Sequence, residues 1–172
     1  KNNGFEAFRA DQIWNWLYVK GVQSFSSMGN ISKQLLIILE KNFSLKPLDI
    51  KKCFKSKDGT IKWLFSLNDN RDIETVYIPE ENRSTICISS QVGCTLSCTF
   101  CHTGTMKFIR NLDASEIIGQ VLKVKNELND WQLKTEDKKV TNIVFMGMGE
   151  PFFNYDNVMK AVNVYKKEKG LG

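Results

Sequence analysis

Three cysteines lie within eight residues, in the stretch Cys94-Thr-Leu-Ser-Cys98-Thr-Phe-Cys101. Because the gaps between them are three residues and two residues, one short loop can turn all three sulfurs toward a single point. Thiolates gathered at one point repel each other unless a metal ion or an iron–sulfur cluster binds them. The spacing therefore predicts a metal-binding or cluster-binding loop.

Several kinds of site are compatible with these residues. A disulfide would pair two thiols and leave the third over. A zinc site needs a fourth ligand, which His102 could supply, and the run from Cys98 to His102 also fits the C-x-x-C-H pattern of haem attachment. Neither of those two patterns requires Cys94 at its position. A four-iron cluster held by three cysteines accounts for all three thiols and leaves one iron open to a ligand.

The residues around the cysteines make a more specific pattern. The loop is preceded by Ile88-Ser-Ser-Gln-Val-Gly-Cys94, and a second glycine-rich stretch follows later as Phe145-Met-Gly-Met-Gly-Glu-Pro151. Together with the cysteine spacing, these stretches resemble the radical S-adenosyl-L-methionine (SAM) superfamily, and within it the RlmN-type RNA adenine-C2 methyltransferases. The resemblance extends from Phe8 to the end of the chain.

The resemblance implies a set of cofactors and ligands. Cys94, Cys98 and Cys101 would hold a 4Fe-4S cluster, and its open iron would chelate the amino and carboxylate groups of SAM. One electron passed into the SAM sulfonium would then release methionine and a 5′-deoxyadenosyl radical. Gly149 and Glu150 would contact SAM, with the glutamate accepting hydrogen bonds from the SAM ammonium group.

The same resemblance implies two further functional residues and the reaction. Glu74 would accept a proton, and Cys87 would pair transiently with a later cysteine that carries the methyl group. The substrates would be C2 of adenine in 23S rRNA at the peptidyl transferase centre and in the tRNA anticodon loop. A flavodoxin-like protein would be the electron donor. No cysteine follows Cys101, so the chain as given is expected to be a fragment that is inactive alone, and a monomer when full length.

Two rival functions remain. A C8-methylating paralogue shares the cysteine loop and the Cys87 position, although the run from Asp113 to Val121 is closer to the C2 enzymes. A zinc-stabilised RNA-binding module would use His102 but has no need of the Gly-Glu-Pro stretch.

Composition is that of an ordinary globular protein. The chain has 172 residues, of which 42% are hydrophobic and 25% charged, and its net charge is +5. No apolar run reaches membrane-spanning length, and no signal peptide is visible. Five cysteines without an export signal indicate a reducing, cytoplasmic location. Six lysines against two aspartates between Lys46 and Lys62 form a basic strip that could follow phosphates.

Hydrophobic spacing divides the first half into helices and strands. Residues 5–45 have apolar residues near helical spacing, with a second helix expected from Ser32 to Asn42. The resemblance makes this region a small RNA-contacting domain. Residues 46–85 predict strands, and Asp58-Gly59 between two of them predicts a hairpin.

The second half predicts alternating strands and helices. We expect a strand from Thr85 to Ser90, a helix from Ser115 to Asn129 and a helix from Asn157 to Lys169. Between the two helices, the apolar run from Val140 to Met146 predicts a strand that is buried on both faces. The predicted fold class is α/β: a partial radical SAM (βα) barrel preceded by a small helical domain and a β-hairpin segment. The expected domains are 1–45, 46–85 and 86–172, the last holding two βα units with the chemistry at the carboxyl ends of the strands.

Overall fold

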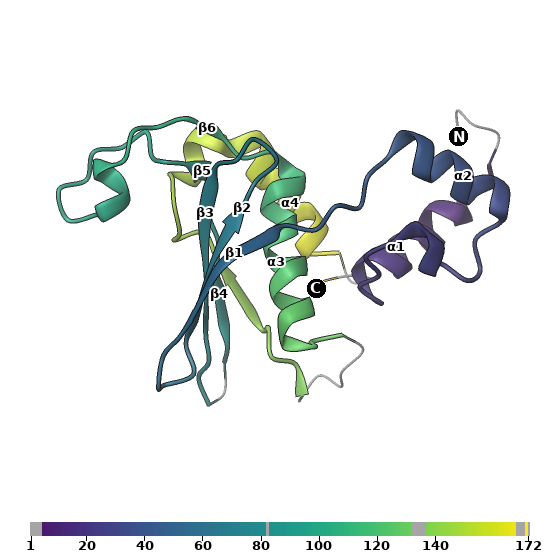
Figure 1. The fold of residues 1–172 in the computed structure, drawn as a ribbon, viewed down its shortest axis with the longest axis horizontal. Coiled ribbons are helices and arrows are strands. Elements are labelled where there is room, and N and C mark those ends of the chain that lie inside the picture. The colour runs from purple at the N-terminus through teal and green to yellow at the C-terminus, as the bar shows by residue number, and fades with distance from the viewer. Residues whose placement is uncertain (1–4, 82, 132–136, 168–170, 172) are drawn as a thin grey trace. The chain divides into compact units, whose positions relative to one another are not determined.

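The structure is a computed structural model that describes residues 5–81, 83–131, 137–167 and 171 (Figure 1). The chain forms two compact units. One comprises residues 1–47 together with 164–172, and the other comprises residues 48–163. Within the ranges given above, no helix is both long enough and apolar enough to cross a membrane.

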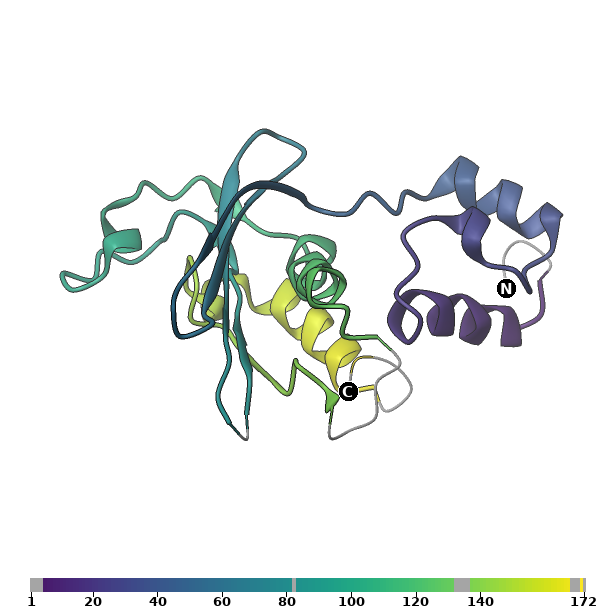
Figure 2. The ribbon, with the colours of Figure 1, turned by 60° about the horizontal axis from the view of Figure 1, so that its bottom comes forward.

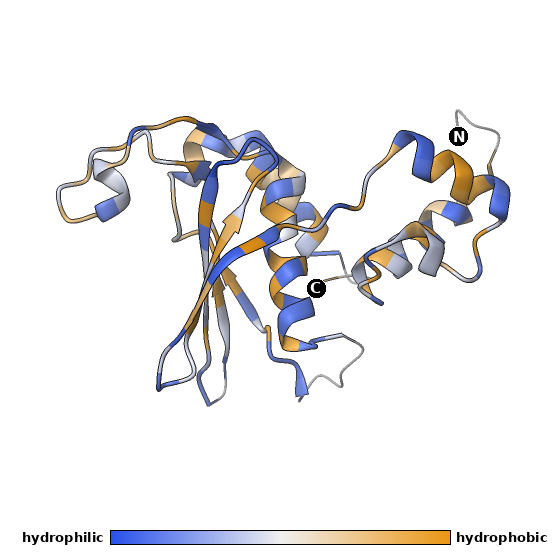
Figure 3. Ribbon diagram, viewed as in Figure 1, coloured by the Kyte–Doolittle hydropathy of each residue, from blue (hydrophilic) through white to orange (hydrophobic). Residues whose placement is uncertain are grey.

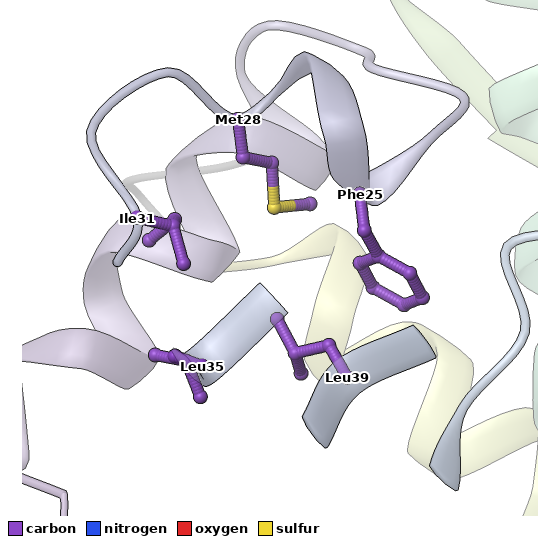
Figure 4. Close-up of a cluster of buried hydrophobic side chains, with 5 residues drawn as sticks. All are labelled: Phe25, Met28, Ile31, Leu35 and Leu39. Atoms are coloured by element: carbon purple, nitrogen blue, oxygen red, sulfur yellow. The ribbon is translucent and has the colours of Figure 1, made fainter. Parts of the chain in front are cut away.

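The first unit is helical, as the sequence predicts. Helix α1 (Phe8–Tyr18) is followed by the short 3-10 helix η1 (Phe25–Ser27) and by α2 (Lys33–Asn42). Ser32 caps α2 by accepting a hydrogen bond from the backbone N–H of Leu35 at 3.4 Å. Apolar side chains from α2, from η1 and from the segment between them pack into a small core (Figure 4): Phe25, Met28, Ile31, Leu35 and Leu39.

The second unit is built on a five-stranded sheet with the order β1-β2-β3-β4-β7. Neighbouring strands are antiparallel from β1 to β4, and β4 and β7 are parallel. The hairpin turn between β1 and β2 is hydrophilic (Figure 3), and its Gly59 has a φ of +86°. The strands are β1 (Asp49–Lys55), β2 (Ile61–Ser66), β3 (Asp72–Ile78), β4 (Thr85–Cys87) and β7 (Asn142–Val144).

The hairpin strands and the barrel strands therefore share one sheet. The domain boundary expected after residue 85 stays a prediction, and β3 pairs directly with β4 across that position. Val76 lies opposite Cys87 in this pairing. The residue pattern predicts the individual strands but does not show which neighbours they pair with.

Two helices lie on one side of the sheet (Figure 2). Helix α3 (Ala114–Leu128) begins at a capping box, in which Asp113 and Glu116 each accept a hydrogen bond from the other's backbone N–H. Helix α4 (Tyr155–Tyr165) follows the 3-10 helix η4 (Pro151–Asn154). Both helices confirm the predicted βα order, and the last residues expected in the second helix, 168–169, lie outside the described residues.

The strands bury alternate side chains against this helical layer. Along β2 and β3 every second residue is buried, as a half-covered sheet requires. The buried series contains Trp63, Phe65, Ile73, Thr75 and Tyr77.

One expectation about burial is wrong. The apolar run from Val140 to Met146 predicts a strand buried on both faces, but β7 is only half-buried and Met146 is 78% exposed. The reason is position, because β7 is the last strand in the order of the described sheet and has β4 as its one neighbour.

Candidate functional site

The cysteine loop and the Gly-Glu-Pro loop lie next to each other. They follow β4 and β7, which are adjacent and parallel, so both loops leave the sheet at the same edge. Backbone hydrogen bonds continue beyond the strands and join the loops: Ser90 N–H donates to the Met148 carbonyl at 2.8 Å, and Gly147 N–H donates to the Ile88 carbonyl at 3.1 Å. The structure thus brings together the two stretches that the sequence singled out.

The cysteine loop is closed at its base by tight backbone packing. Gly93 has a φ of +74°, and a Cβ at this position would lie 2.1 Å from the carbonyl oxygen of Lys107 on the returning strand. Gly104 packs in the same way against the backbone of Cys98, because a Cβ at Gly104 would lie 2.8 Å from the Cys98 carbonyl oxygen. The loop also includes the 3-10 helix η2 (His102–Thr105) and returns through β6 (Arg110–Asn111), which pairs with β5 (Gln91–Val92).

The three loop cysteines are half-buried free thiols. The Leu96 N–H points at the Cys94 sulfur at 3.4 Å, a contact of the kind that stabilises a sulfur carrying negative charge. Among the residues that the structure describes, however, no three His, Cys, Asp or Glu side chains are close enough together to hold a metal ion. The loop carries the possible ligands for either kind of site. These are the three cysteine sulfurs for an iron–sulfur cluster, and the same sulfurs with His102 for zinc.

The glycines of the Gly-Glu-Pro loop are required by packing. A Cβ on Gly147 would lie 2.7 Å from the Ile88 carbonyl oxygen, and one on Gly149, which has a φ of +91°, would lie 2.4 Å from the Cβ of Gln91. The family resemblance gives this stretch the role of contacting SAM. The structure supplies an independent reason for the glycines, because the loop lies directly on the chain that leads into the cysteine loop.

Glu150 sits at the start of η4. One of its oxygens, Oε1, accepts a hydrogen bond from the Phe152 N–H at 3.1 Å and so caps that helix. A carboxylate has two acceptor oxygens, and Oε2 has no partner among the residues described. Glu150 can therefore cap η4 and accept from an ammonium group at the same time.

Buried polar side chains hold the two loops against the sheet. The Ser89 hydroxyl, fully buried, donates to the Glu74 carbonyl at 2.6 Å and accepts from the Met148 N–H at 3.0 Å. Asn154 in η4 donates through Nδ2 to the carbonyls of Ser90 (2.8 Å) and Leu112 (2.7 Å). Sequence reasoning did not select these residues. The signal in the sequence was the polar run Ser89-Ser-Gln91, which directly follows an apolar strand.

Glu74 and Cys87 share the face of the sheet that the helices leave uncovered. Thr75, next to Glu74, points to the helical side, where its hydroxyl donates to Gln120 of α3 at 2.8 Å. Successive residues of a strand point to opposite faces, so Glu74 and Val76 point away from α3. Since Cys87 lies opposite Val76, Cys87 is on that same face, diagonally across from Glu74.

The two side chains have different surroundings. The Glu74 carboxylate forms an ion pair with Lys62 Nζ at 3.0 Å, and both side chains are more than 40% exposed. Cys87 is half-buried, and this burial raises the pKa of its thiol, partly offset by a hydrogen bond with the Met146 backbone. Glu74 is thus an accessible carboxylate, and Cys87 is a thiol held in its neutral form at pH 7.

Comparisons with known proteins follow the same division of the chain. Residues 1–45 match the model of the ribosomal RNA large subunit methyltransferase N-terminal domain, and residues 88–171 match that of the radical SAM superfamily. Proteins named dual-specificity RNA methyltransferase RlmN from Paracoccus denitrificans and Parvibaculum lavamentivorans are 48% and 49% identical over 95% of this chain. These relatives are RlmN-type radical SAM proteins, and the chain is similar to them over 95% of its length. It spans 43% of the length of each of those two relatives.

A solved structure agrees with this assignment. A radical SAM methyltransferase from Sphaerobacter thermophilus superimposes with a TM-score of 0.87 at 37% identity, over 99% of this chain and 49% of that protein. The predicted fold class, a partial radical SAM barrel, is confirmed. The similarity to radical SAM proteins implies a 4Fe-4S cluster and SAM as cofactors. The donor set fits them, since three soft sulfur donors lie in one loop and a carboxylate lies in the adjacent loop.

Proposed function

We propose that this chain is the cluster-binding and SAM-binding part of a radical SAM methyltransferase that methylates adenine at C2 in 23S rRNA and in tRNA. The observation that carries the proposal is the placement of the cysteine loop and the Gly-Glu-Pro loop side by side at the carboxyl edge of two parallel strands. The relatives are named as RNA methyltransferases, which supports an RNA substrate. We further propose that the reaction takes place in the cytoplasm, with a flavodoxin-like electron donor and a monomeric full-length enzyme.

The loop residues divide the cofactor work between them. Cys94, Cys98 and Cys101 would hold the cluster, and the cluster with SAM would supply radical chemistry at a carbon that is too electron-poor to attack a methyl group itself. Glu150 would accept hydrogen bonds from the SAM ammonium group through the oxygen that does not cap η4. Gly149 would keep the loop backbone close to the strand.

The uncovered face of the sheet supplies the other two roles. Glu74 would accept a proton from the methylated base, and its exposed carboxylate forms an ion pair with Lys62 at 3.0 Å. Cys87 would form the transient disulfide with the methyl-carrying cysteine. All five cysteines are free thiols in this structure, as a transient bond allows.

The basic strip on β1 is the proposed RNA contact. Every residue of β1 is exposed, and Lys52 and Lys55 have no ion pair within the described part of the chain. Lys51, in contrast, is bound to Asp72 at 2.6 Å. Replacing Lys52 and Lys55 with alanine should flatten the log–log salt dependence of RNA binding by about 0.7 to 0.9 for each phosphate that the protein no longer neutralises.

A matched control for this experiment lies on the helical side of the sheet. Lys123 pairs with Glu127 along α3 at 2.9 Å, and Lys123→Ala removes one lysine charge from a different surface, to be compared with Lys52→Ala or Lys55→Ala alone. If Lys123→Ala flattens the salt slope as much as the Lys52 and Lys55 changes do, the strip is only a solvated face.

Metal analysis with a methylation assay tests the central proposal. Anaerobic reconstitution should give about four iron and four sulfide per chain, and Cys98→Ala should lower both, whereas alanine at the exposed Cys53 should not. The full-length protein should transfer the methyl group of labelled SAM to C2 of adenine in rRNA. One zinc per chain without sulfide would overturn the proposal, and product methylated at C8 would assign the chain to the paralogous activity.

A further inference from the structure

One fully buried side chain connects the two cofactor loops. Gln91 lies between Ile88 and Cys94, and its exposure is 0%. Its Oε1 accepts a hydrogen bond from the Glu150 backbone N–H at 3.0 Å. The same oxygen is 3.4 Å from both the backbone nitrogen and the hydroxyl of Thr95, the residue after Cys94. A single oxygen therefore contacts donors from the Gly-Glu-Pro loop and from the cysteine loop.

The other end of the amide is also fixed. Nε2 of Gln91 donates to Oδ1 of Asn111 in β6 at 2.8 Å, and Nδ2 of Asn111 donates to the Phe153 carbonyl in η4 at 3.1 Å. The orientation of the amide follows from these partners, because two backbone N–H groups face one end and a carbonyl oxygen faces the other. Glutamine is thus matched to a site that needs an acceptor and a donor at opposite ends.

The backbones of Gln91 and the Gly-Glu-Pro loop are packed so closely that neither can move without the other. The Gln91 N–H donates to the Met148 carbonyl at 3.2 Å. Gly149 approaches so closely that its missing Cβ would lie 2.4 Å from the Cβ of Gln91. A shift of the Gly-Glu-Pro loop must therefore displace Gln91, which in turn contacts Thr95.

We propose that Gln91 is a positioning residue that couples the two loops, so that gathering of the cysteines around a cluster also orders the backbone that presents Glu150. The inference rests on the proposed function of these loops. Cluster assembly would then favour SAM binding by ordering Glu150, in addition to any direct contact between the two cofactors.

Hydrogen–deuterium exchange at the Glu150 amide is the direct readout, because this amide donates to Gln91 and belongs to neither the cluster nor SAM. In wild type, anaerobic cluster assembly should slow exchange at Glu150. Gln91→Met keeps most of the side-chain volume but removes both ends of the amide. In cluster-free protein it should speed exchange at Glu150 by about tenfold or more, since the absence of this hydrogen bond leaves the loop free to open.

The decisive comparison combines the two changes. In Gln91→Met, cluster assembly should no longer slow exchange at Glu150, and the affinity of the cluster-loaded protein for SAM should fall by about tenfold or more. Thr75→Val is the matched control, because Thr75 is equally buried and loses one hydrogen bond to Gln120 on the helical side. It should leave both readouts as in wild type.

Each outcome bears on the inference. If the cluster slows Glu150 exchange equally in Gln91→Met and in wild type, or if Thr75→Val weakens SAM binding as much, Gln91 is only a buried structural residue. Should Gln91→Met not fold, Gln91→Asn retains an amide one methylene too short to reach Glu150, and the same results are expected of it. If wild type assembles no cluster at all, the proposed function fails and the inference with it; if it assembles one, only the inference is at risk.

Discussion

Replacing Gly149 with alanine separates two explanations of the Gly-Glu-Pro loop. If the glycine serves only to leave room for SAM, the protein without cofactors should not be affected by a methyl group. The structure predicts the opposite, because the new Cβ would meet the Cβ of Gln91 at 2.4 Å and its backbone nitrogen at 2.8 Å. Gly149 also has a φ of +91°, which side chains rarely adopt.

The size of the effect follows from these two terms. A residue held at an unfavourable positive φ loses about 1–3 kcal/mol, and overpacking of a closely packed site loses about 1–3 kcal/mol more. The loop can relieve part of the clash by moving outward, but this movement breaks the hydrogen bond between Glu150 and Gln91. We therefore expect Gly149→Ala to lower the free energy of unfolding of residues 48–163 by about 2–5 kcal/mol.

Urea denaturation of the cofactor-free protein measures this loss. Pulsed hydrogen–deuterium exchange of peptides from β4 and α3 reports the second unit alone, because Ile86 and Ile117 there are fully buried. Gly29→Ala, followed through peptides of the first unit, in which it lies, is the control for the substitution itself, since a Cβ at Gly29 would meet nothing within 4 Å. Its effect should be within about 0.5 kcal/mol, as at other open surface positions.

A different pattern of results would refute the packing argument. If Gly149→Ala is as stable as Gly29→Ala without cofactors but loses SAM binding, the glycine is needed for the cofactor and not for the loop. If it is destabilised but Glu150 exchanges as slowly as in wild type, the clash is relieved somewhere other than at Gln91.

Two further predictions concern a buried ion pair and a buried thiol. Asp130 is fully buried and binds Lys125 at 2.8 Å, so Asp130→Asn should lower the free energy of unfolding by about 3 kcal/mol or more. Glu127→Gln, at a more exposed ion pair on α3, should change that free energy by less than about 1 kcal/mol. Equal effects of the two substitutions in urea denaturation would contradict this prediction. Because burial raises the pKa of Cys87 above the ordinary thiol value of 9.0, Cys87 should be alkylated by iodoacetamide more slowly than the exposed Cys53 at pH 8, with its rate still rising above pH 9. Peptide mapping of the alkylated protein at several pH values measures these rates. The raised pKa of Cys87 also means that the stability contributed by the neutral thiol is present below the unfolded-state pKa and is lost as the pH rises through the folded-state pKa.

Local signals in the sequence were sufficient for the elements that position the site. Asp58-Gly59 predicts the hairpin because a positive φ is needed there, and Gly59 adopts one. The helix expected from Ser115 begins at Ala114, directly after a capping box formed by Asp113 and Glu116. Apolar runs located β4 and β7, and their parallel pairing follows from the intervening helix. These features depend on residues near each other in the chain.

Features that depend on distant partners could not be predicted in this way. The apolar run around β7 gives no indication that the strand is the last in the order of the described sheet, where it is only half-buried. Gln91 looks like one polar residue among several, since its partners Asn111 and Glu150 are far away in sequence. The roles of Glu74 and Cys87 came from family resemblance, and only the register of β3 and β4 places both on one face.

The polar contacts that hold the Gly-Glu-Pro loop come from one short segment of the chain. Backbone groups of the Gly-Glu-Pro loop are bound by Ser89 and Gln91, two buried side chains from a single strand extension. The same extension leads directly into Cys94, so the spacing between Gln91 and the first cysteine sets the distance between the two loops. Inserting one residue between Gln91 and Cys94 would preserve every cysteine and every glycine but would separate Thr95 from the Gln91 oxygen. Such an insertion should therefore uncouple the two loops without removing any proposed ligand. The number of residues between Gln91 and Cys94 is then as important for the site as the identity of Gln91 and of the cysteines.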